Sequence, residues 1–154
     1  ADRAVEHFPD DPRAYVTLAS GYRLHTAYES AVRAFARALE LSPDDAVLRA
    51  ELGFTQQMAG EDHAAMETFR RALKSYLPAM YRVRVYYHLH QAYSRLGEMA
   101  AAQAARTQMV KAQGGLSAWR TGLHALDGTA YGQVLRYEID AIEAVIAAET
   151  APIR

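Results

Sequence analysis

The chain has 154 residues, enough for one ordinary domain. Its formal net charge of -1 excludes a globally basic nucleic-acid binder, and its 51% of hydrophobic residues excludes a disordered tail. No Cys is present, which excludes disulfides, thiolate nucleophiles and Cys-ligated zinc. No apolar run approaches the roughly 18 residues of a transmembrane helix, so we expect no membrane insertion. The first residues are typical of the middle of a helix, and we expect the chain to be a fragment of a longer protein.

Helix signals follow one another along the chain, and no stretch alternates as a strand does. Acidic and hydroxyl residues that precede apolar, helix-periodic segments are candidate N-caps. They are Asp11 before Pro12, Thr26 with Glu29 as a capping box, Asp45, Asp62 and Ser117. Gly60 and Gly97 stand where a left-handed residue ends a helix. The sequence therefore predicts helices over 1–7, 13–25, 27–41, 46–59, 63–76, 80–96, 99–113, 117–126 and 130–149.

A set of aromatic, aliphatic and small residues recurs in register along this series of helices. The first copy consists of Tyr15, Leu18, Ala19, Tyr22, Ala31, Phe35, Ala38 and Pro43. A shift of 34 residues gives Leu52, Gly53, Gln56, Ala65, Phe69 and Ala72. A further shift of 37 gives Tyr86, Leu89, Tyr93, Gly97 and Ala102. We expect the three extra residues to fall around Ser75 to Tyr81.

This spacing resembles the tetratricopeptide repeat (TPR), which has a period of about 34 residues. The first copy fits every position of the TPR pattern, whereas the later copies depart from it at several positions. The departures are Arg49 and Gln56 in the second copy, and His90, Arg106 and Met109 in the third. The resemblance implies an all-α fold, a right-handed superhelix of antiparallel helix pairs in which each pair buries its apolar face on the next.

The predicted domain organisation follows from this register. Residues 1–113 comprise a half repeat, 1–11, and three repeats, 12–45, 46–79 and 80–113. Residues 114–154 form a degenerate helix pair that caps the solenoid, because stacked repeats leave the last one with an open face. The second helix of this pair carries a broad apolar stripe, and a dimerisation helix is the alternative interpretation.

No pattern in the sequence predicts catalysis. His88 and His90 are two residues apart and therefore point to different sides of a helix, whereas a metal pair needs i and i+4. Acidic residues around His63 stand at a helix start, where they favour the helix dipole. No glycine-rich loop follows a strand, so we expect no phosphate cradle. The prediction is a protein that is not an enzyme and has no catalytic residue, metal site or cofactor.

The resemblance to TPR proteins implies a concave, partner-binding face, lined by fixed positions of the first helix of each repeat. The partner-binding residues that it implies are Arg13, Val16, Ser20, Arg23, Leu24, Phe54, Gln57, Met58, Arg84, Tyr87, Gln91 and Arg95. Apolar side chains form the middle of this set and four Arg surround them, and Arg binds carboxylates in a two-pronged geometry. We therefore expect a protein or peptide partner of acidic character, and no nucleic acid.

The expected function is that of a non-catalytic interaction module or scaffold that binds a partner segment in this groove. Two alternatives stay open: an accessory TPR domain of a bacterial polysaccharide secretion system or other envelope assembly, and a module that self-associates into a homo-oligomer. Two Lys against 15 Arg, with no Asn, are typical of a GC-rich bacterial genome. A soluble protein of the cytoplasm or of the periplasm fits this composition, and the identity of the ligand is left open.

Overall fold

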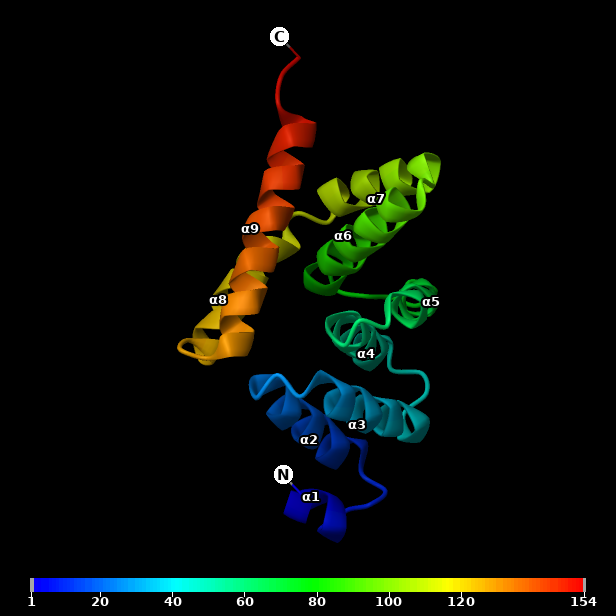
Figure 1. The fold of residues 1–154 in the computed structure, drawn as a ribbon, viewed down its shortest axis with the longest axis vertical. Helices are drawn as coiled ribbons and strands as arrows, with labels where there is room; N and C mark the ends of the chain where they lie inside the picture. The colour runs from blue at the N-terminus through cyan, green and yellow to red at the C-terminus, as the bar shows by residue number, and fades with distance from the viewer. Residues whose placement is uncertain (1, 154) are drawn as a thin grey trace. The chain divides into compact units, whose positions relative to one another are not determined.

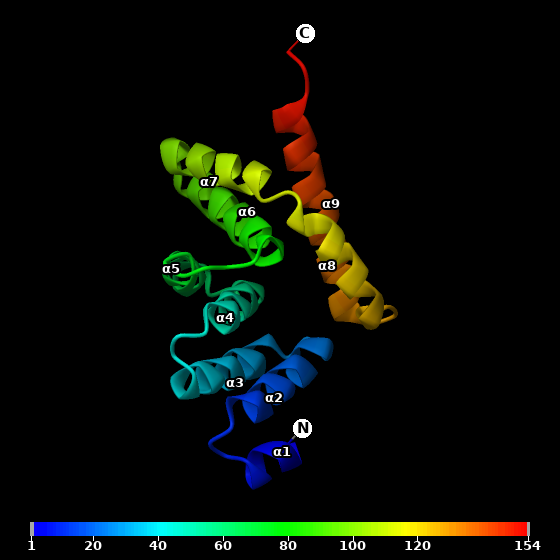
Figure 2. The ribbon, with the colours of Figure 1, turned by 180° about the vertical axis from the view of Figure 1, so that it is seen from behind.

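The computed structural model describes residues 2–153. Within this range nine α-helices and one short 3-10 helix follow one another, with no strand, so the all-α prediction is confirmed. The chain divides into two compact units, Ala1–Leu77 and Pro78–Arg154, and each is described by itself. Figure 1 shows the helices in chain order, and Figure 2 shows them from behind.

The first unit consists of one short helix followed by two antiparallel helix pairs. Its helices are α1 (Asp2–His7), α2 (Pro12–Leu24), α3 (Tyr28–Leu41), α4 (Ala46–Met58) and α5 (Asp62–Ala72). Helices α2 and α3 pack together, α4 and α5 do likewise, and α4 also packs on α3 (Figures 1 and 2). Consecutive helical hairpins therefore stack, as the repeat predicts.

The second unit contains a third helix pair and a C-terminal segment. Its helices are α6 (Ala79–Leu96), α7 (Met99–Lys111), α8 (Gly115–Leu123), the 3-10 helix η1 (His124–Leu126) and α9 (Ala130–Thr150). Helices α6 and α7 form the pair, α8 packs on α6, and α9 packs on α8 and touches α7. The boundary between the units lies close to the predicted boundary between the second and third repeats. The exact repeat and cap boundaries stay predictions.

Side-chain caps begin three of these helices. Asp11 accepts a hydrogen bond of 2.9 Å from the backbone N–H two residues on, at the start of α2. Asp45 and Thr129 each accept one of 2.9 Å from the N–H three residues on, at the starts of α4 and α9. These bonds satisfy N–H groups that have no partner inside a helix. The cap predictions for Asp11 and Asp45 are confirmed.

Thr26 is not the N-cap that its sequence context predicts. Its φ is +56°, and Ala27 stands at the N-cap of α3 with no side-chain bond. The N–H of Ala27 bonds back to the carbonyl of Tyr22, which is the bond that closes the C-terminal turn of α2. Gly60 and Gly97 occupy the equivalent places with φ of +83° and +76°. The left-handed turn between the helices of a pair therefore decides the conformation of Thr26.

Two other predicted caps are wrong. Asp62 is the first residue of α5, and Glu61 stands at the N-cap without a side-chain bond. Ser117 lies inside α8, because backbone hydrogen bonds donated by Gly115 and Leu116 begin that helix two residues earlier.

A small residue on the first helix of each early pair lets the second helix approach closely. At Gly53 a Cβ atom would lie 2.5 Å from Cε1 of Phe69, closer than carbon atoms approach, so the Phe69 ring fills the place of the missing side chain. The equivalent Ala19 is fully buried in one cluster with Phe35. Small and large side chains thus interdigitate across each pair, as close packing requires.

In the third pair the large side chain at this contact lies on the first helix instead of the second. His90 stands where the first two pairs have a small residue, and its Nδ1–H donates to the carbonyl of Ala102 at 3.0 Å. Arg106 stands where they have Phe, and it forms an ion pair of 2.8 Å with Glu149 on α9. In this pair the ring therefore lies on the first helix, as His90. The second helix contributes Arg106, which pairs with α9.

Candidate interaction surface

Helix α2 carries five of the predicted partner-binding residues at helical spacing. These residues are Arg13, Val16, Ser20, Arg23 and Leu24, and they share one face because side chains three, four and seven residues apart lie together on a helix. Arg13 is exposed and Leu24 keeps 38% of its surface exposed, whereas the other three are half-buried. The structure brings these five side chains to one surface and leaves an aliphatic side chain open at its end.

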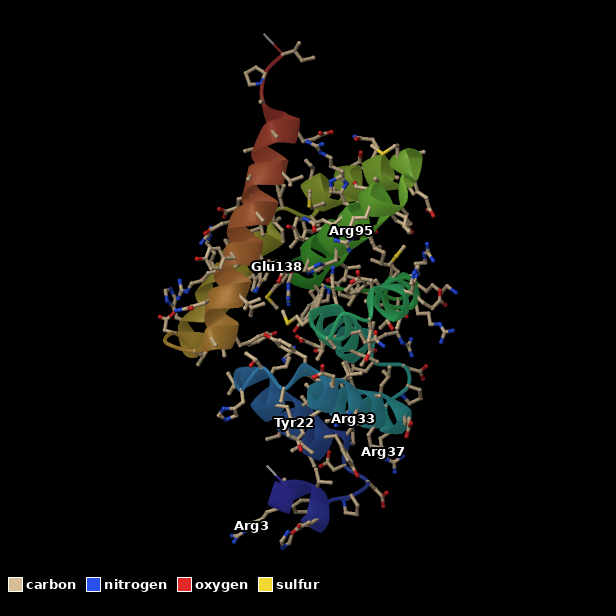
Figure 3. All side chains as sticks on the ribbon, viewed as in Figure 1. Arg3, Tyr22, Arg33, Arg37, Arg95 and Glu138 are labelled. Carbon is tan, nitrogen blue, oxygen red and sulfur yellow. The ribbon has the colours of Figure 1, made fainter. Side chains whose placement is uncertain are left out.

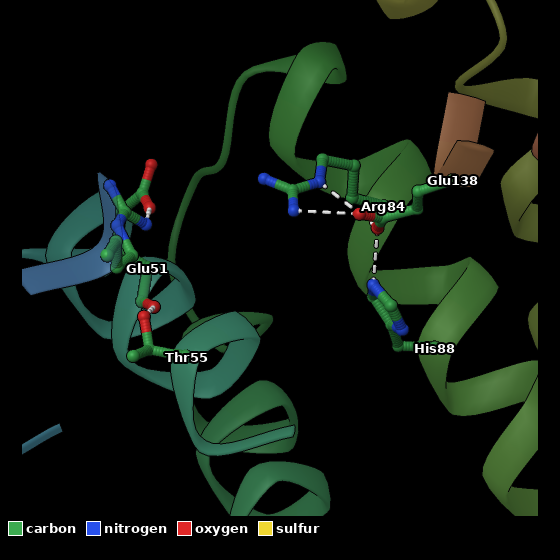
Figure 4. Close-up of polar contacts among 6 residues, drawn as sticks. Glu51, Thr55, Arg84, His88 and Glu138 are labelled. Atoms are coloured by element: carbon green, nitrogen blue, oxygen red, sulfur yellow. Dashed lines mark hydrogen bonds and ion pairs between the residues drawn. The ribbon is translucent and has the colours of Figure 1, made fainter. Parts of the chain in front are cut away.

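Arg23 joins the first helix pair to the second. Its Nη1 donates a hydrogen bond to the carboxylate of Glu51 on α4. Glu51 is labelled in Figure 4. Its guanidinium also lies 4.7 Å from the centroid of the Phe35 ring. The side chains of Arg23 and Glu51 are only 12% and 20% exposed. A paired and stacked guanidinium holds the two helix pairs together, and its charge is balanced within the chain.

Arg13 is also paired, but in solvent. Its Nε and Nη2 donate to the carboxylate of Asp11 at 3.1 and 2.8 Å, and its side chain is 89% exposed. The hydrogen bonds from Arg13 hold the pKa of Asp11 below its usual value. Exposed ion pairs contribute little to stability. Arg13 can therefore exchange Asp11 for a carboxylate of another molecule at a small cost in free energy.

Helix α4 supplies two surface residues and one core residue. Gln57 and Met58 are half-buried. Phe54, in contrast to the open position expected for it, is only 1% exposed. The Phe69 ring that fills the gap at Gly53 also packs against the Phe54 ring, with the ring centroids 5.2 Å apart. Phe54 is therefore a packing residue in this structure.

The four predicted residues of α6 differ in exposure along the helix. Arg84 and Tyr87 are buried, at 5% and 7% exposed, Gln91 is half-buried and Arg95 is exposed (Figure 3). Nε2 of Gln91 donates to Oη of Tyr87 at 2.6 Å. Burial, and then the nearby charge of Glu138, raise the pKa of Tyr87. The N-terminal half of this face is therefore covered by the chain itself, in contrast to the open groove that was expected.

A buried ion cluster joins α6 to α9. Nε and Nη2 of Arg84 donate to the two carboxylate oxygens of Glu138 at 3.2 and 3.0 Å, and Nε2 of His88 contacts the same carboxylate (Figure 4). The Arg84 guanidinium lies 4.5 Å from the centroid of the Trp119 ring on α8. The side chains of Arg84 and Glu138 are 6% and 8% exposed. One carboxylate on α9 thus binds two side chains of α6.

The charges of this cluster keep Glu138 ionised. Burial alone would raise the pKa of Glu138, but the charge of Arg84, aided by His88, outweighs burial and lowers the pKa to about 2. Removal of the carboxylate that pairs with a buried Arg lowers the free energy of unfolding by about 3–5 kcal/mol. Arg84 is therefore committed to Glu138 in this structure and is not open to a partner.

Neither Glu138 nor His88 is among the binding residues that the sequence predicts. Glu138 stands in the apolar stripe of α9, next to Leu135 and Ile139, which are 3% and 0% exposed. An acid on a buried stripe indicates a buried basic partner, because charged residues are almost never fully buried unless paired. That signal was available. His88 carries no comparable signal, because its contact depends on where α9 docks.

Among residues 2–153 no group of three or more His, Asp and Glu is placed to hold a metal ion. In that same part of the chain no helix is both long enough and apolar enough to pass through a membrane. The side chains described above donate hydrogen bonds, pair charges and expose aliphatic groups, which are the elements of a binding surface.

No protein-family model matches the chain, and no curated protein matches it in sequence. Among solved structures 23 chains match, and one of them is the crystal structure of MamA, a TPR-like protein. MamA is similar to this chain with a TM-score of 0.66 at 21% identity, and the match covers 96% of this chain and 83% of the MamA chain. This likeness establishes the fold: the chain is a TPR-like solenoid of helix pairs.

Proposed function

We propose that this chain is a non-catalytic interaction module that binds a segment of a partner protein. The binding site is the α2–α4 surface, which we define as Arg13, Val16, Ser20, Arg23, Leu24, Gln57 and Met58. The observation that carries the proposal is the exposed Leu24, at 38%, with Met58 at the equivalent position one repeat later. Equivalent positions of successive repeats face the same side of a solenoid. The repeat's own packing does not require a large apolar residue there.

The internal ion pairs refine the expected acidity of the partner. An acidic segment would have to compete with Glu51 for Arg23, whereas Arg13 is accessible. We infer that apolar contacts at Leu24 and Met58 supply most of the affinity. Arg13 adds a charge-assisted hydrogen bond to one carboxylate of the partner.

Selection from a displayed library of protein segments, with the immobilised chain as bait, tests this proposal. A selected segment should bind Leu24→Glu at least about tenfold more weakly, which corresponds to about 1.4 kcal/mol, because a charge replaces the aliphatic contact. Arg33→Gln is the matched control, since it changes the net charge equally at an exposed residue of α3 (Figure 3). The proposal fails if no segment is enriched over bare matrix, or if Leu24→Glu binds the segment as tightly as the unmodified chain.

A further inference from the structure

Helix α9 is an acidic amphipathic helix that lies on the rest of its own unit. One side buries an aliphatic stripe, which consists of Leu135, Ile139, Ile142 and Ile146. Four acidic residues and one Arg give the helix a net charge of −3. This combination of an aliphatic stripe with carboxylates is the form in which an acidic helix binds a basic groove.

Each of the four carboxylates of α9 contacts a basic side chain of the same unit. Glu138 binds Arg84 and His88 on α6. The remaining pairs are Glu149 with Arg106 on α7 at 2.8 Å, and Asp140 and Glu143 with Arg120 on α8 at 3.0 and 2.6 Å. Basic residues from three different helices thus converge on one acidic helix. The surface beneath α9 is therefore complementary in charge to an acidic helix.

The ion pairs between α9 and α8 are open to solvent. The Asp140 and Glu143 side chains that pair with Arg120 are 66% and 45% exposed. A pocket of about 430 Å³ opens beside α8 and α9, with Leu116 and Ile146 among its lining residues. The turn before α9 contains Gly128 with φ of +80°. Exposed ion pairs contribute little to stability, so the buried carboxylate of Glu138 is the main polar attachment of the helix.

We propose that α9 is an internal ligand, and that the surface beneath it binds an acidic amphipathic helix of a partner protein once α9 leaves. This receptor surface is defined by Arg84, His88, Arg106, Trp119 and Arg120. The partner helix carries a carboxylate within an aliphatic stripe, as α9 carries Glu138. The inference deepens the proposed interaction role, but it concerns a different surface from the α2–α4 surface, so either can fail alone.

Helix α9 competes with an external helix for the receptor surface, and its covalent linkage to the chain favours α9. A helix joined by a short turn has an effective concentration in the millimolar range. An external helix of equal intrinsic affinity therefore binds the unmodified chain only weakly. Weakening the attachment of α9 without removing the basic residues should expose the receptor surface, and an external helix should then bind more tightly.

The test uses the full chain and a fluorescein-labelled synthetic peptide that copies residues 130–150. The double variant Glu138→Gln/Glu149→Gln should bind this peptide at least about tenfold more tightly than the unmodified chain does. The matched control is Glu40→Gln/Glu67→Gln, which removes two exposed ion pairs of the first unit and should leave the affinity unchanged. A peptide with Gln at the position of Glu138 should lose at least about tenfold in affinity for the double variant.

Equal affinity of the folded double variant and the unmodified chain would overturn the inference, as would a peptide that binds equally well without its carboxylate. Circular dichroism reports whether the variant folds. If it does not, hydrogen exchange of the unmodified chain decides: amides of α9 should exchange faster than those of α6, and equal rates would contradict the proposal. Leu24→Glu should leave peptide binding unchanged, which separates this outcome from a failure of the α2–α4 surface.

Discussion

Glu138 lies at the meeting point of three helices. Its carboxylate pairs with the side chains of Arg84 and His88 on α6, and the Arg84 guanidinium stacks on Trp119 of α8. Buried ion pairs often add little net stability compared with an apolar replacement, but an arrangement that leaves one partner unpaired is strongly destabilised. We therefore expect the cluster to fix the register of α9, because a shift of one turn would leave Arg84 buried without its carboxylate.

The stability that Glu138 contributes should be lost in acid. Its pKa of about 2 in the folded chain lies below the ordinary value of 4.5, so the contribution is complete above pH 4.5 and disappears as the pH falls toward 2. At neutral pH the unmodified chain should exceed Glu138→Gln in free energy of unfolding by about 3 kcal/mol, because Gln imitates the protonated acid. Urea unfolding of both chains at a series of pH values measures this difference.

The exposed Glu143 provides the control for that series. Glu143→Gln breaks a pair with Arg120 in which both side chains are more than 40% exposed, so its effect should stay below about 1 kcal/mol. A difference between the unmodified chain and Glu138→Gln that stays constant down to pH 2 would contradict the assignment of a lowered pKa to Glu138.

Among the secondary-structure elements, the turn inside each helix pair is the most regular feature. Thr26, Gly60 and Gly97 all have positive φ, and the next residue of each turn bonds back to the helix before it. Gly adopts this conformation without strain, whereas a β-branched residue adopts it only at a cost of about 1–3 kcal/mol. The first pair therefore contains strain that the other two pairs avoid.

Thr26→Gly should consequently stabilise the chain. Relief of the left-handed strain exceeds the added flexibility of the unfolded chain, and we expect a gain of about 1 kcal/mol in the free energy of unfolding. Urea unfolding of the variant measures the gain. Thr26→Ala, which keeps a Cβ atom in the same conformation, should give a smaller gain. Loss of stability in Thr26→Gly would show instead that the Thr26 side chain supports the turn.

The same residue shows what the sequence can and cannot predict about elements. The order of the helices, the caps at Asp11 and Asp45 and the turns at Gly60 and Gly97 follow from local signals and match the structure. Thr26 was expected to be a cap because Thr and a following Glu form a local capping pattern. The geometry of the helix pair overrides that pattern, and only comparison with equivalent turns reveals it.

For the molecule as a whole, the repeat pattern predicts which faces of the first helices point away from the packing interfaces. It does not predict what covers them. Leu24 stays open on α2, whereas Arg84 and Tyr87 on α6 are buried beside the C-terminal helices. Residues after 113 do not follow the repeat, so their docking position depends on long-range charge pairs such as Arg84 with Glu138. Such pairs cannot be located from periodicity.

Chemical-shift mapping by NMR tests the central claim, partner binding on the α2–α4 surface, most directly. The isotope-labelled chain is titrated with a segment selected by display, and backbone amide shifts are followed. The largest shifts should fall around Val16, Leu24 and Met58, and the shifts of α3 and α5 should stay unchanged outside their contacts with α2 and α4. Shifts concentrated on exposed residues of α3, such as Arg33 and Arg37, would contradict it (Figure 3).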